Sequence, residues 1–599
     1  MGEPRRTKVT IKGFLIWNFL LICLLFQVFL ITKATFLYPV LKVLFVLEVL
    51  GLIAAFVRAS LKEKAVLLAL VLIIGIRIPF YAQGDGLLLH SDNALDALQA
   101  FETQHSHTAP FFLLDSSSHN GTLKYLFVAC VWDFFGTSYL GFVLVQLGIF
   151  LVFIFLLYEI FRRLLDEKVV LLFLFVHFAF IEVIFDYSLF LRAAPYLEML
   201  TVFLLGVSLF DFSFTDKLRL VQAWFFVLFS SYLHPLVVFL IIPFGLTAVL
   251  ISLRKKKLWP ALATLLAGGV LGAYHLVYYR LAGPTPPPSG EWYRIIFFSP
   301  SQFSLAKVPE YLQALGRDLW TAFHNLFDFE FLYSLQFFEA TGPAARLLRA
   351  MNRSIIFLSA AVALVAVVVS CRKLWLWLKK KSDAEIWPSL FYVLTFLVLV
   401  GKAFALSPRP FAEPRHNMDM ALWVAIGYLI VFSAFLPLRK VLSVRFVALA
   451  LLFFALTVPH YVYYLKIAQF KKESYQEIIP LLTAKRVRYL ATDFSLAYPV
   501  YFLTHQKIEV SDSLGPVTVS FFYPWLRERV DKVPWQEKAY LFFGDAYYRG
   551  NQRAWHREMT HNVRQRILQR LQKEDVPYTV HKLANYTIII PKPAAGADG

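Results

Sequence analysis

Residues 87–115 read LLLHSDNALDALQAFETQHSHTAPFFLLD and begin soon after an apolar run, 65–81, that is long enough to cross a membrane. Asp92 and Asp96 are four residues apart, so on a helix they share a face with Gln99, opposite an apolar face. The pattern predicts an amphipathic helix that rests on the bilayer surface. A carboxylate beside an apolar wall can have a raised pKa and serve as a base, whereas the plainer interpretation is a set of solvated loop charges.

The composition of the chain is that of a polytopic membrane protein. Of its 599 residues 58% are hydrophobic, and the mean hydropathy is +0.60, far more apolar than a soluble domain. Apolar runs of roughly 17–22 residues, with one shorter run, predict about 13 membrane-crossing helices. The runs lie at about 13–31, 38–57, 65–81, 139–160, 168–185, 195–211, 219–232, 235–252, 259–280, 354–371, 386–405, 418–437 and 444–463.

We interpret the net charge of +19 as a signal of membrane topology, and we expect no nucleic-acid partner. Much of the Lys and Arg lies in short clusters between apolar runs, such as RKKK at 254–257 and KKK at 379–381. Such clusters favour the cytoplasmic side, and together they predict a cytoplasmic amino terminus only if residues 121–136 do not cross. We therefore predict that 121–136 is a helix in the outer interface and that 82–138 and 281–353 are external loops. The predicted location is a bacterial inner membrane.

The tail, residues 466–599, differs from the rest of the chain. Strand-like segments such as VRYLATDF and YTVHKLANYTIIIP occur with a helical segment, REMTHNVRQRILQRLQ. The predicted fold is an all-α polytopic membrane domain over 1–465, with interfacial helices in its first external loop, followed by a small external α/β domain over 466–599. The three cysteines lie in apolar runs, so no disulfide framework is expected.

Several stretches, in their order along the chain, resemble one enzyme superfamily. They are SDNALDALQAFE (91–102), PFFLLDSSSHNGTLKYLFVACVWDFFGTS (110–138), DYSLFLRAAPYLEML (186–200), SSYLHPLVVFLIIP (230–243), EPRHNMDMALWVAIGYL (413–429) and VRYLATDFSLAYPVYFLTHQKIEVSDS (487–513). Together they resemble the GT-C glycosyltransferases, multispan enzymes that include protein O-mannosyltransferases, lipid A aminoarabinose transferases and many bacterial relatives. A GT-C-like arrangement of the membrane domain is therefore expected.

The resemblance implies an inverting transfer of a sugar from a polyprenyl-phosphate donor to an acceptor on the outer side. Asp92 stands at the family's acidic position and would be the base that takes the acceptor's proton. The family usually has Asp-Glu there, whereas this chain has Asp92-Asn93. Asp186 and Glu198 would belong to the second acidic loop as further catalytic carboxylates. Asp96 is expected to be solvated and dispensable.

The departing lipid phosphate needs positive charge, because negative charge develops on it in the transition state. Arg415, His416 and Arg192 are the candidates for binding it, since a guanidinium can hold two phosphate oxygens at once. A divalent metal ion could also serve, but the H-x-H pattern of His105 and His107 is a weak metal signature. His234, before a proline, is expected to cap a hairpin.

Two other classes of function stay open. A transporter or flippase of lipid-linked saccharides would also be multispan, but it should carry charges near the membrane midplane and paired repeats. Here the ionisable residues gather at the outer ends of the spans, which favours the enzyme. A non-catalytic membrane scaffold is the other alternative, because of the Asp-Asn departure. The expected partners are the lipid-phosphate donor, membrane lipids and a glycan, lipid or protein acceptor that the sequence leaves undefined.

Overall fold

The structure is a computed structural model of the whole chain. It describes residues 11–62, 64–84, 91–110, 121–162, 196–281, 309, 313, 316–317, 320–321, 343–379, 386–405, 418–435, 465, 468–470, 472–514, 523–544, 554–583 and 585–592.

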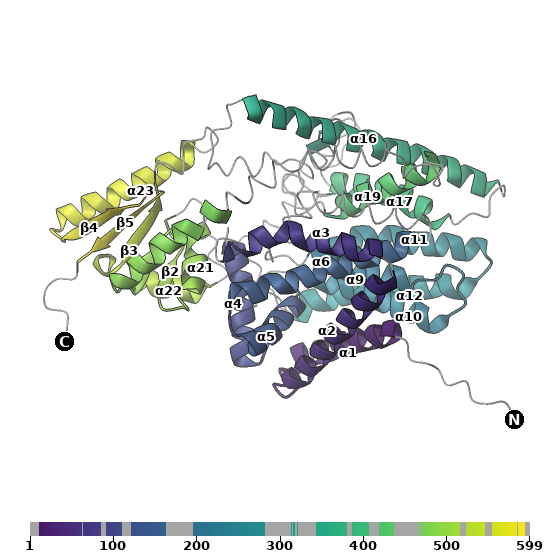
Figure 1. Ribbon diagram of the computed structural model, residues 1–599, viewed down its shortest axis with the longest axis horizontal. Helices are drawn as coiled ribbons and strands as arrows, with labels where there is room; N and C mark the ends of the chain where they lie inside the picture. Colours follow the sequence, from purple (N-terminus) through teal and green to yellow (C-terminus); the bar gives the residue numbers. More distant parts are fainter. Residues whose placement is uncertain are drawn as a thin grey trace.

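Most of the described chain forms helices, and most of these are apolar (Figure 1). They are α1 (Ile11–Thr32), α2 (Leu37–Lys62), α3 (Lys64–Tyr81), α4 (Ser91–Ser106), α5 (Leu123–Phe135), α6 (Tyr139–Phe161), α9 (Tyr196–Leu209), α10 (Lys217–Leu233), α11 (Val238–Arg254), α12 (Leu258–Leu281), α16 (Pro343–Leu378), α17 (Trp387–Ala405) and α19 (Met418–Phe435). Five of the described helices are long and apolar enough to cross a membrane. The protein is an integral membrane protein.

The helices differ in how much apolar surface they bury inside the protein. In α6, 61% of the apolar window is buried, against 6% in α2. Side chains such as Val43, Leu50 and Ile53 on α2 are more than half exposed, and in a bilayer they would meet lipid tails at no cost in apolar hydration. The helix α6 therefore belongs to the centre of the bundle, and α2 to its periphery.

Helices occupy most of the predicted spans. The count of about 13 spans stays a prediction, because 168–185 and 444–463 lie outside the described residues. One boundary differs from the sequence prediction: α16 begins at Pro343, eleven residues before the predicted start of the span at 354. The added segment, AARLLRAMNR, is rich in strong helix formers, so the helix continues into what was predicted as a loop.

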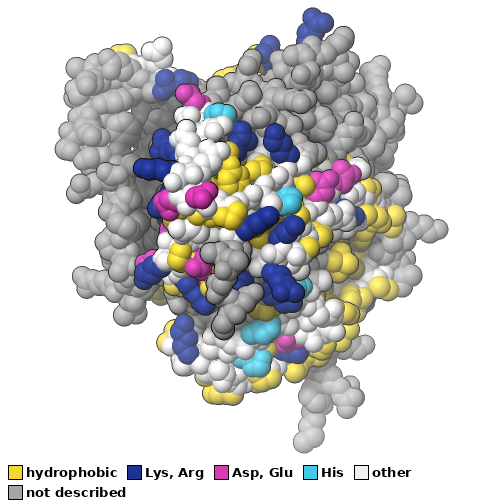
Figure 2. All heavy atoms as spheres, turned by 90° about the vertical axis from the view of Figure 1, so that its left-hand side faces the viewer, with side chains coloured by type: hydrophobic (Ala, Val, Ile, Leu, Met, Phe, Trp, Pro, Cys, Tyr) yellow, Lys and Arg dark blue, Asp and Glu magenta, His cyan; other side chains and the backbone are white. Residues whose placement is uncertain are grey.

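The tail contains a small mixed sheet, as the sequence predicted. Its elements are β1 (Tyr489–Ala491), α21 (Phe494–Leu503), β2 (Glu509–Ser511), α22 (Pro524–Lys532), β3 (Ala539–Phe543), α23 (Ala554–Lys573), β4 (Tyr578–Lys582) and β5 (Tyr586–Pro591), and the strand order is β2-β1-β3-β5-β4. The strand β1 pairs in parallel with β2 and β3, whereas β5 is antiparallel to β3 and β4. On the face of the tail seen in Figure 2, Lys and Arg side chains are interspersed with acidic and apolar ones.

The tail and the first-loop helices share one hydrophobic core. Buried side chains of α4 and α5, such as Leu95, Leu98 and Trp132, join the same cluster as Leu496 and Val500 of α21. Figure 1 shows α4 at the boundary between the tail and the apolar helices. The tail is thus fastened to the part of the chain that follows the third apolar helix. The domain boundary at 465 stays a prediction.

Candidate functional site

The segment that leads into α5 packs tightly against the end of α10. The backbone amide of Gly121 donates to the carbonyl of Leu233, 3.0 Å away. A Cβ at Gly121 would lie 2.8 Å from the carbonyl oxygen of Tyr232, closer than real Cβ atoms come, so only glycine fits. Nδ1 of His234 accepts from the Leu236 amide at 3.2 Å, which confirms the predicted capping role. This docking brings α5 beside α9 and α10.

A buried charged cluster lies where α4, α5 and α9 meet. We call Asp96, Lys124, Tyr125 and Glu198 the charged cluster. Lys124 Nζ is 3.1 Å from Asp96 Oδ2 and 3.9 Å from Glu198 Oε1, and the Tyr125 hydroxyl donates to Asp96 Oδ1. The side chains of Asp96 and Lys124 are 0% and 1% exposed, and that of Glu198 is 9% exposed. These four side chains, which water would normally solvate, therefore depend on one another for hydrogen bonds and charge compensation.

The charged cluster contains two carboxylates and one ammonium group. Burial raises the pKa of Asp96 to about 7, although the charge of Lys124 and the bond from Tyr125 oppose that rise. Desolvation penalises the ionised carboxylate, while two donors on its two oxygens favour it. Asp96 is therefore a carboxyl group that exchanges its proton near neutral pH. Such shifted groups gather at functional sites more often than elsewhere.

The prediction that Asp96 is solvated was wrong, and its dispensability for activity stays a prediction. The polar face of α4 is buried, since Asn93, Asp96, Gln99 and Thr103 are each at most 2% exposed. The helix packs against both α5 and α21, and its position relative to the bilayer stays a prediction. The i, i+4 spacing located the helix face correctly, but the sequence gives no sign that the tail returns to cover the helix.

Only one of the predicted site residues is described with its side chain. Glu198 lies in the first turn of α9, buried, and joins the charged cluster. Asp92 lies in the first turn of α4, but its side chain is outside the described residues. Three predicted residues, Asp186, Arg192 and Arg415, and also His416, lie outside the described residues too. Their roles stay predictions.

Sequence reasoning missed Lys124, Tyr125 and a second buried ion pair. The prediction for 121–136 was a helix in the outer interface, with no role for Lys124. In fact eight residues of α5 are buried, while Phe134 and Phe135 at its end are 55% and 82% exposed. A lysine in an apolar helix near an acidic loop was the available signal, because a buried ammonium needs a partner.

The second buried ion pair joins α17 and α19. Lys402 Nζ lies 3.1 and 2.9 Å from the two oxygens of Asp419, and both side chains are at most 2% exposed. Asp419 Oδ1 also accepts from the backbone amide of Met420 at 2.9 Å. Asp419 lies within the stretch EPRHNMDM, four residues after the predicted phosphate-binding residue Arg415.

The described residues contain no group of three or more His, Cys, Asp or Glu side chains suited to a metal ion. His105 bonds the carbonyl of Phe101 at 2.9 Å, and the ring of His107 stacks on Tyr38 at 4.6 Å. The two histidines thus have separate local contacts. Asp96 and Glu198 both face Lys124, which already supplies positive charge to them.

Comparison with known proteins finds structural likeness alone. No family model matches the chain, and no curated protein sequence matches it. The structural neighbours include the archaeal oligosaccharyltransferase AglB from Archaeoglobus fulgidus, in complex with an inhibitory peptide and a dolichol-phosphate. That match has a TM-score of 0.40 and 13% identity, over 81% of this chain and 70% of that one.

Another neighbour is ArnT from Cupriavidus metallidurans bound to undecaprenyl phosphate, with a TM-score of 0.42 and 12% identity, over 87% of this chain and 97% of that one. Both neighbours are GT-C glycosyltransferases, the superfamily that the sequence motifs resemble. At these scores the likeness carries no argument about the reaction. What each neighbour binds is a property of that protein.

Proposed function

We propose that the chain is an inverting glycosyltransferase that moves a sugar from a polyprenyl-phosphate donor to an acceptor on the outer side of the membrane. The observation that carries the proposal is the charged cluster, in which Asp96, on the helix that bears Asp92, is buried with Lys124 and Glu198. Buried ionisable groups in a membrane protein are costly, and function is the usual reason to keep them. The sequence motifs supply the reaction class.

The proposed reaction forms one bond and breaks one. The acceptor hydroxyl oxygen attacks the anomeric carbon while the bond from that carbon to the lipid-phosphate oxygen breaks, so the configuration inverts. Asp92 takes the hydroxyl proton as general base, and Asp186 and Glu198 are the further acidic residues. Arg415, His416 and Arg192 bind the departing phosphate, whose negative charge grows as the bond breaks.

The charged cluster serves that chemistry by fixing α4. Asp96 lies one turn after Asp92 on the same helix, and its bonds to Lys124 and Tyr125 tie that helix to α5. Glu198 extends the tie to α9. A base works only within hydrogen-bond reach of the proton that it takes, so a fixed helix keeps Asp92 in place. A divalent cation could add positive charge at the phosphate, but no step above depends on one.

The proposed topology follows the charge clusters. We place the amino terminus in the cytoplasm and the tail outside a bacterial inner membrane, because this arrangement puts the Lys and Arg clusters between spans inside. Reporter fusions at Arg254 and Arg570 test it. An external Arg254 would contradict the arrangement.

A transfer assay tests the reaction. The purified protein in lipid nanodiscs would be given radiolabelled polyprenyl-phosphate sugars and a membrane extract as the source of acceptors, and label in the acceptor fraction would be counted. We expect Asp92→Asn to lower transfer at least 100-fold, as removal of a general base commonly does. The matched control is Glu528→Gln, the same loss of charge at an exposed position of the tail. Equal transfer by native protein and Asp92→Asn would contradict the proposal.

One observation favours the second candidate, a transporter or flippase of lipid-linked saccharides. The Lys402–Asp419 pair is buried between two apolar helices, and buried ion pairs of this kind occur along transport pathways. A flipping assay with fluorescent lipid-linked saccharides in proteoliposomes would test it. Flipping without transfer, lost in Asp419→Asn, would replace the enzyme by the transporter. If the protein shows neither flipping nor transfer, the non-catalytic scaffold is the remaining alternative.

A further inference from the structure

A hydrogen bond joins the tail to α4 across 421 residues of sequence. The hydroxyl of Tyr523 donates to Oε1 of Glu102 at 2.9 Å. Tyr523 is only 4% exposed, whereas Glu102 lies at the surface on the last part of α4. Burial, and next the nearby Glu102 carboxylate, raise the pKa of Tyr523 far above its usual range. The tyrosine therefore stays a donor across the physiological pH range.

Apolar packing supports that contact. The helix α21 lies along α4, and Phe502 of α21 stacks on Trp132 of α5 with ring centroids 6.2 Å apart. The ring of Tyr523 packs near Tyr498 of α21 at 5.8 Å. The tail thus covers the side of α4 that faces away from the charged cluster, and the Tyr523 bond lies at the edge of this cover.

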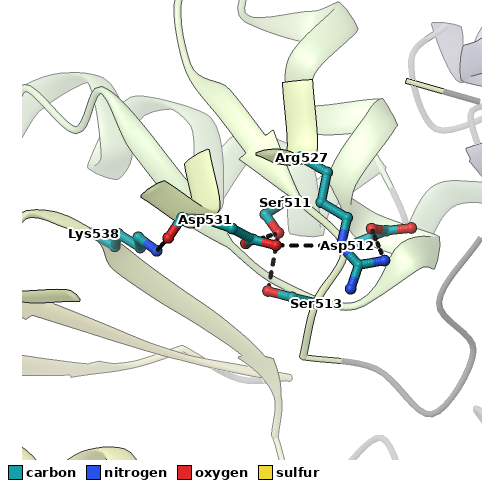
Figure 3. Close-up of polar contacts among 6 residues, drawn as sticks. All are labelled: Ser511, Asp512, Ser513, Arg527, Asp531 and Lys538. Atoms are coloured by element: carbon teal, nitrogen blue, oxygen red, sulfur yellow. Dashed lines mark hydrogen bonds and ion pairs between the residues drawn. The ribbon is translucent and has the colours of Figure 1, made fainter. Parts of the chain in front are cut away.

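A polar network on the tail side joins α22 to the end of β2 (Figure 3). Asp531 of α22 accepts from the hydroxyl of Ser511, at the end of β2, at 2.7 Å. Arg527 Nε donates to Asp531 Oδ2 at 3.3 Å, and Arg527 Nη1 is 3.9 Å from Asp512 Oδ1. The helix α22 is therefore fastened to the sheet. Tyr523 immediately precedes α22, so its position is fixed by the same contacts.

We propose that Tyr523 is a positioning residue, which acts through Glu102 to hold α4 in the register that the charged cluster requires. Glu102 lies six residues beyond Asp96, roughly 9 Å along the helix axis. The cluster fixes the first half of α4 from the membrane side, and Tyr523 fixes the second half from the tail. The tail is then part of the working site. The catalytic consequence rests on the proposed function, but the restraint on α4 does not.

The experiment compares two Tyr→Phe variants, each of which loses one hydroxyl group. Tyr523→Phe keeps the aromatic ring and removes the bond to α4. Tyr540→Phe is the matched control, because its hydroxyl donates to the Trp535 carbonyl at 2.7 Å, wholly within the tail. The readouts are the amide hydrogen exchange of α4 and, in the transfer assay, kcat and the KM for the donor. Because a loss of folded protein would by itself lower the apparent kcat at constant KM, kcat is calculated per mole of folded protein, as measured by size-exclusion chromatography.

We expect Tyr523→Phe to speed exchange over 94–104 about tenfold, as the loss of one hydrogen bond to a charged group allows, with Tyr540→Phe near native there. We expect kcat to fall by about 5–10-fold while the donor KM stays within about twofold. Glu102→Gln keeps an acceptor oxygen and should stay near native, while Glu102→Ala should match Tyr523→Phe. Combining Glu102→Ala with Tyr523→Phe should add less than the sum of the two effects, because both variants remove the bond between these side chains.

Two results would overturn the proposal. One is exchange over α4 that is no faster in Tyr523→Phe than in Tyr540→Phe. The other is full additivity of Glu102→Ala and Tyr523→Phe. If native protein transfers no sugar, the proposed function fails, and the exchange data alone then decide whether Tyr523 restrains α4.

Discussion

Two buried ion pairs between the helices differ in their charge balance. Lys402 meets both oxygens of one carboxylate, Asp419, at 3.1 and 2.9 Å. Lys124 lies between two carboxylates, 3.1 Å from Asp96 and 3.9 Å from Glu198. The first pair is neutral as a unit, while the second group of charges has an excess of acid.

The difference in charge balance suggests different roles for the two groups: the neutral pair holds two helices together, whereas the charged cluster can change its protonation state. A neutral, doubly bonded pair satisfies its own charges and ties α17 to α19, so it has little reason to change state. A buried group with an excess of acid can lower its energy by taking up a proton or by attracting further positive charge. The charged cluster is therefore the better candidate for chemistry, and each variant below tests that contrast.

The largest effect is expected from Lys124→Met, which removes the single ammonium of the charged cluster at similar side-chain volume. It leaves Asp96 and Glu198 facing each other without compensation, and breaking a buried pair in this way costs about 3–5 kcal/mol. We expect little folded protein by size-exclusion chromatography in detergent, and no transfer. The control Lys217→Met alters an exposed lysine at the start of α10. Native yield of Lys124→Met would mean that the cluster does not support the fold.

A smaller effect is expected at the neutral pair. Lys402→Met alone should destabilise the protein by about 3 kcal/mol, because one buried carboxylate is left. Replacing both partners, as Lys402→Met with Asp419→Leu, should recover most of that loss, since no charge then stays buried. Melting temperatures in detergent would measure both changes. If the double variant were as unstable as Lys402→Met, another group in the protein would need the charge or the hydrogen bonds of this pair.

The sequence could predict the fold around the two buried ion pairs only in part. Hydropathy located the apolar helices and the change of character near 466, because both depend on local composition. The helix at 91–106 and the strands of the tail also followed from local periodicity. The burial of Asp96 could not be predicted, because it depends on tertiary contacts with Lys124 and Tyr125 of α5 and on the approach of Glu198 from α9.

The site itself was predicted less well than the fold. Glu198 was selected through its position in an acidic loop, and the structure adds Lys124 and Tyr125, which face it from another helix. A lysine inside an apolar run carries no mark of its partner, so sequence spacing cannot pair residues that are 74 positions apart, as Lys124 and Glu198 are. Asp92, Asp186 and Arg415 stay predictions.

The charged cluster should also respond to pH. Asp96 binds its proton with a pKa of about 7 in the folded protein, against about 3.9 in an unfolded chain. Its contribution to stability is therefore complete below pH ~4 and is lost as the pH rises through ~7. Asp96→Asn should flatten that part of the curve of melting temperature against pH. An unchanged slope in Asp96→Asn would assign the pH dependence to other groups.

The smallest effect is expected from Tyr125→Phe, which removes one donor from Asp96 and leaves the ion pair. A hydrogen bond to a charged group contributes about 1.5–3 kcal/mol, against about 0.5–1.5 kcal/mol for one between neutral groups. The matched control is Tyr428→Phe, because the buried Tyr428 hydroxyl shares a hydrogen bond of 2.9 Å with a neutral group, the Ser359 hydroxyl. The Tyr125 bond favours the ionised form of Asp96, so its loss should move the fall in stability to higher pH as well as lowering the melting temperature. Tyr428→Phe should lower the melting temperature less and leave the pH of the fall unchanged. If Tyr125→Phe and Tyr428→Phe changed the melting temperature and the pH of the fall equally, Tyr125 would act by packing. The protonation of Asp96 beside Lys124 would then not depend on the Tyr125 hydroxyl.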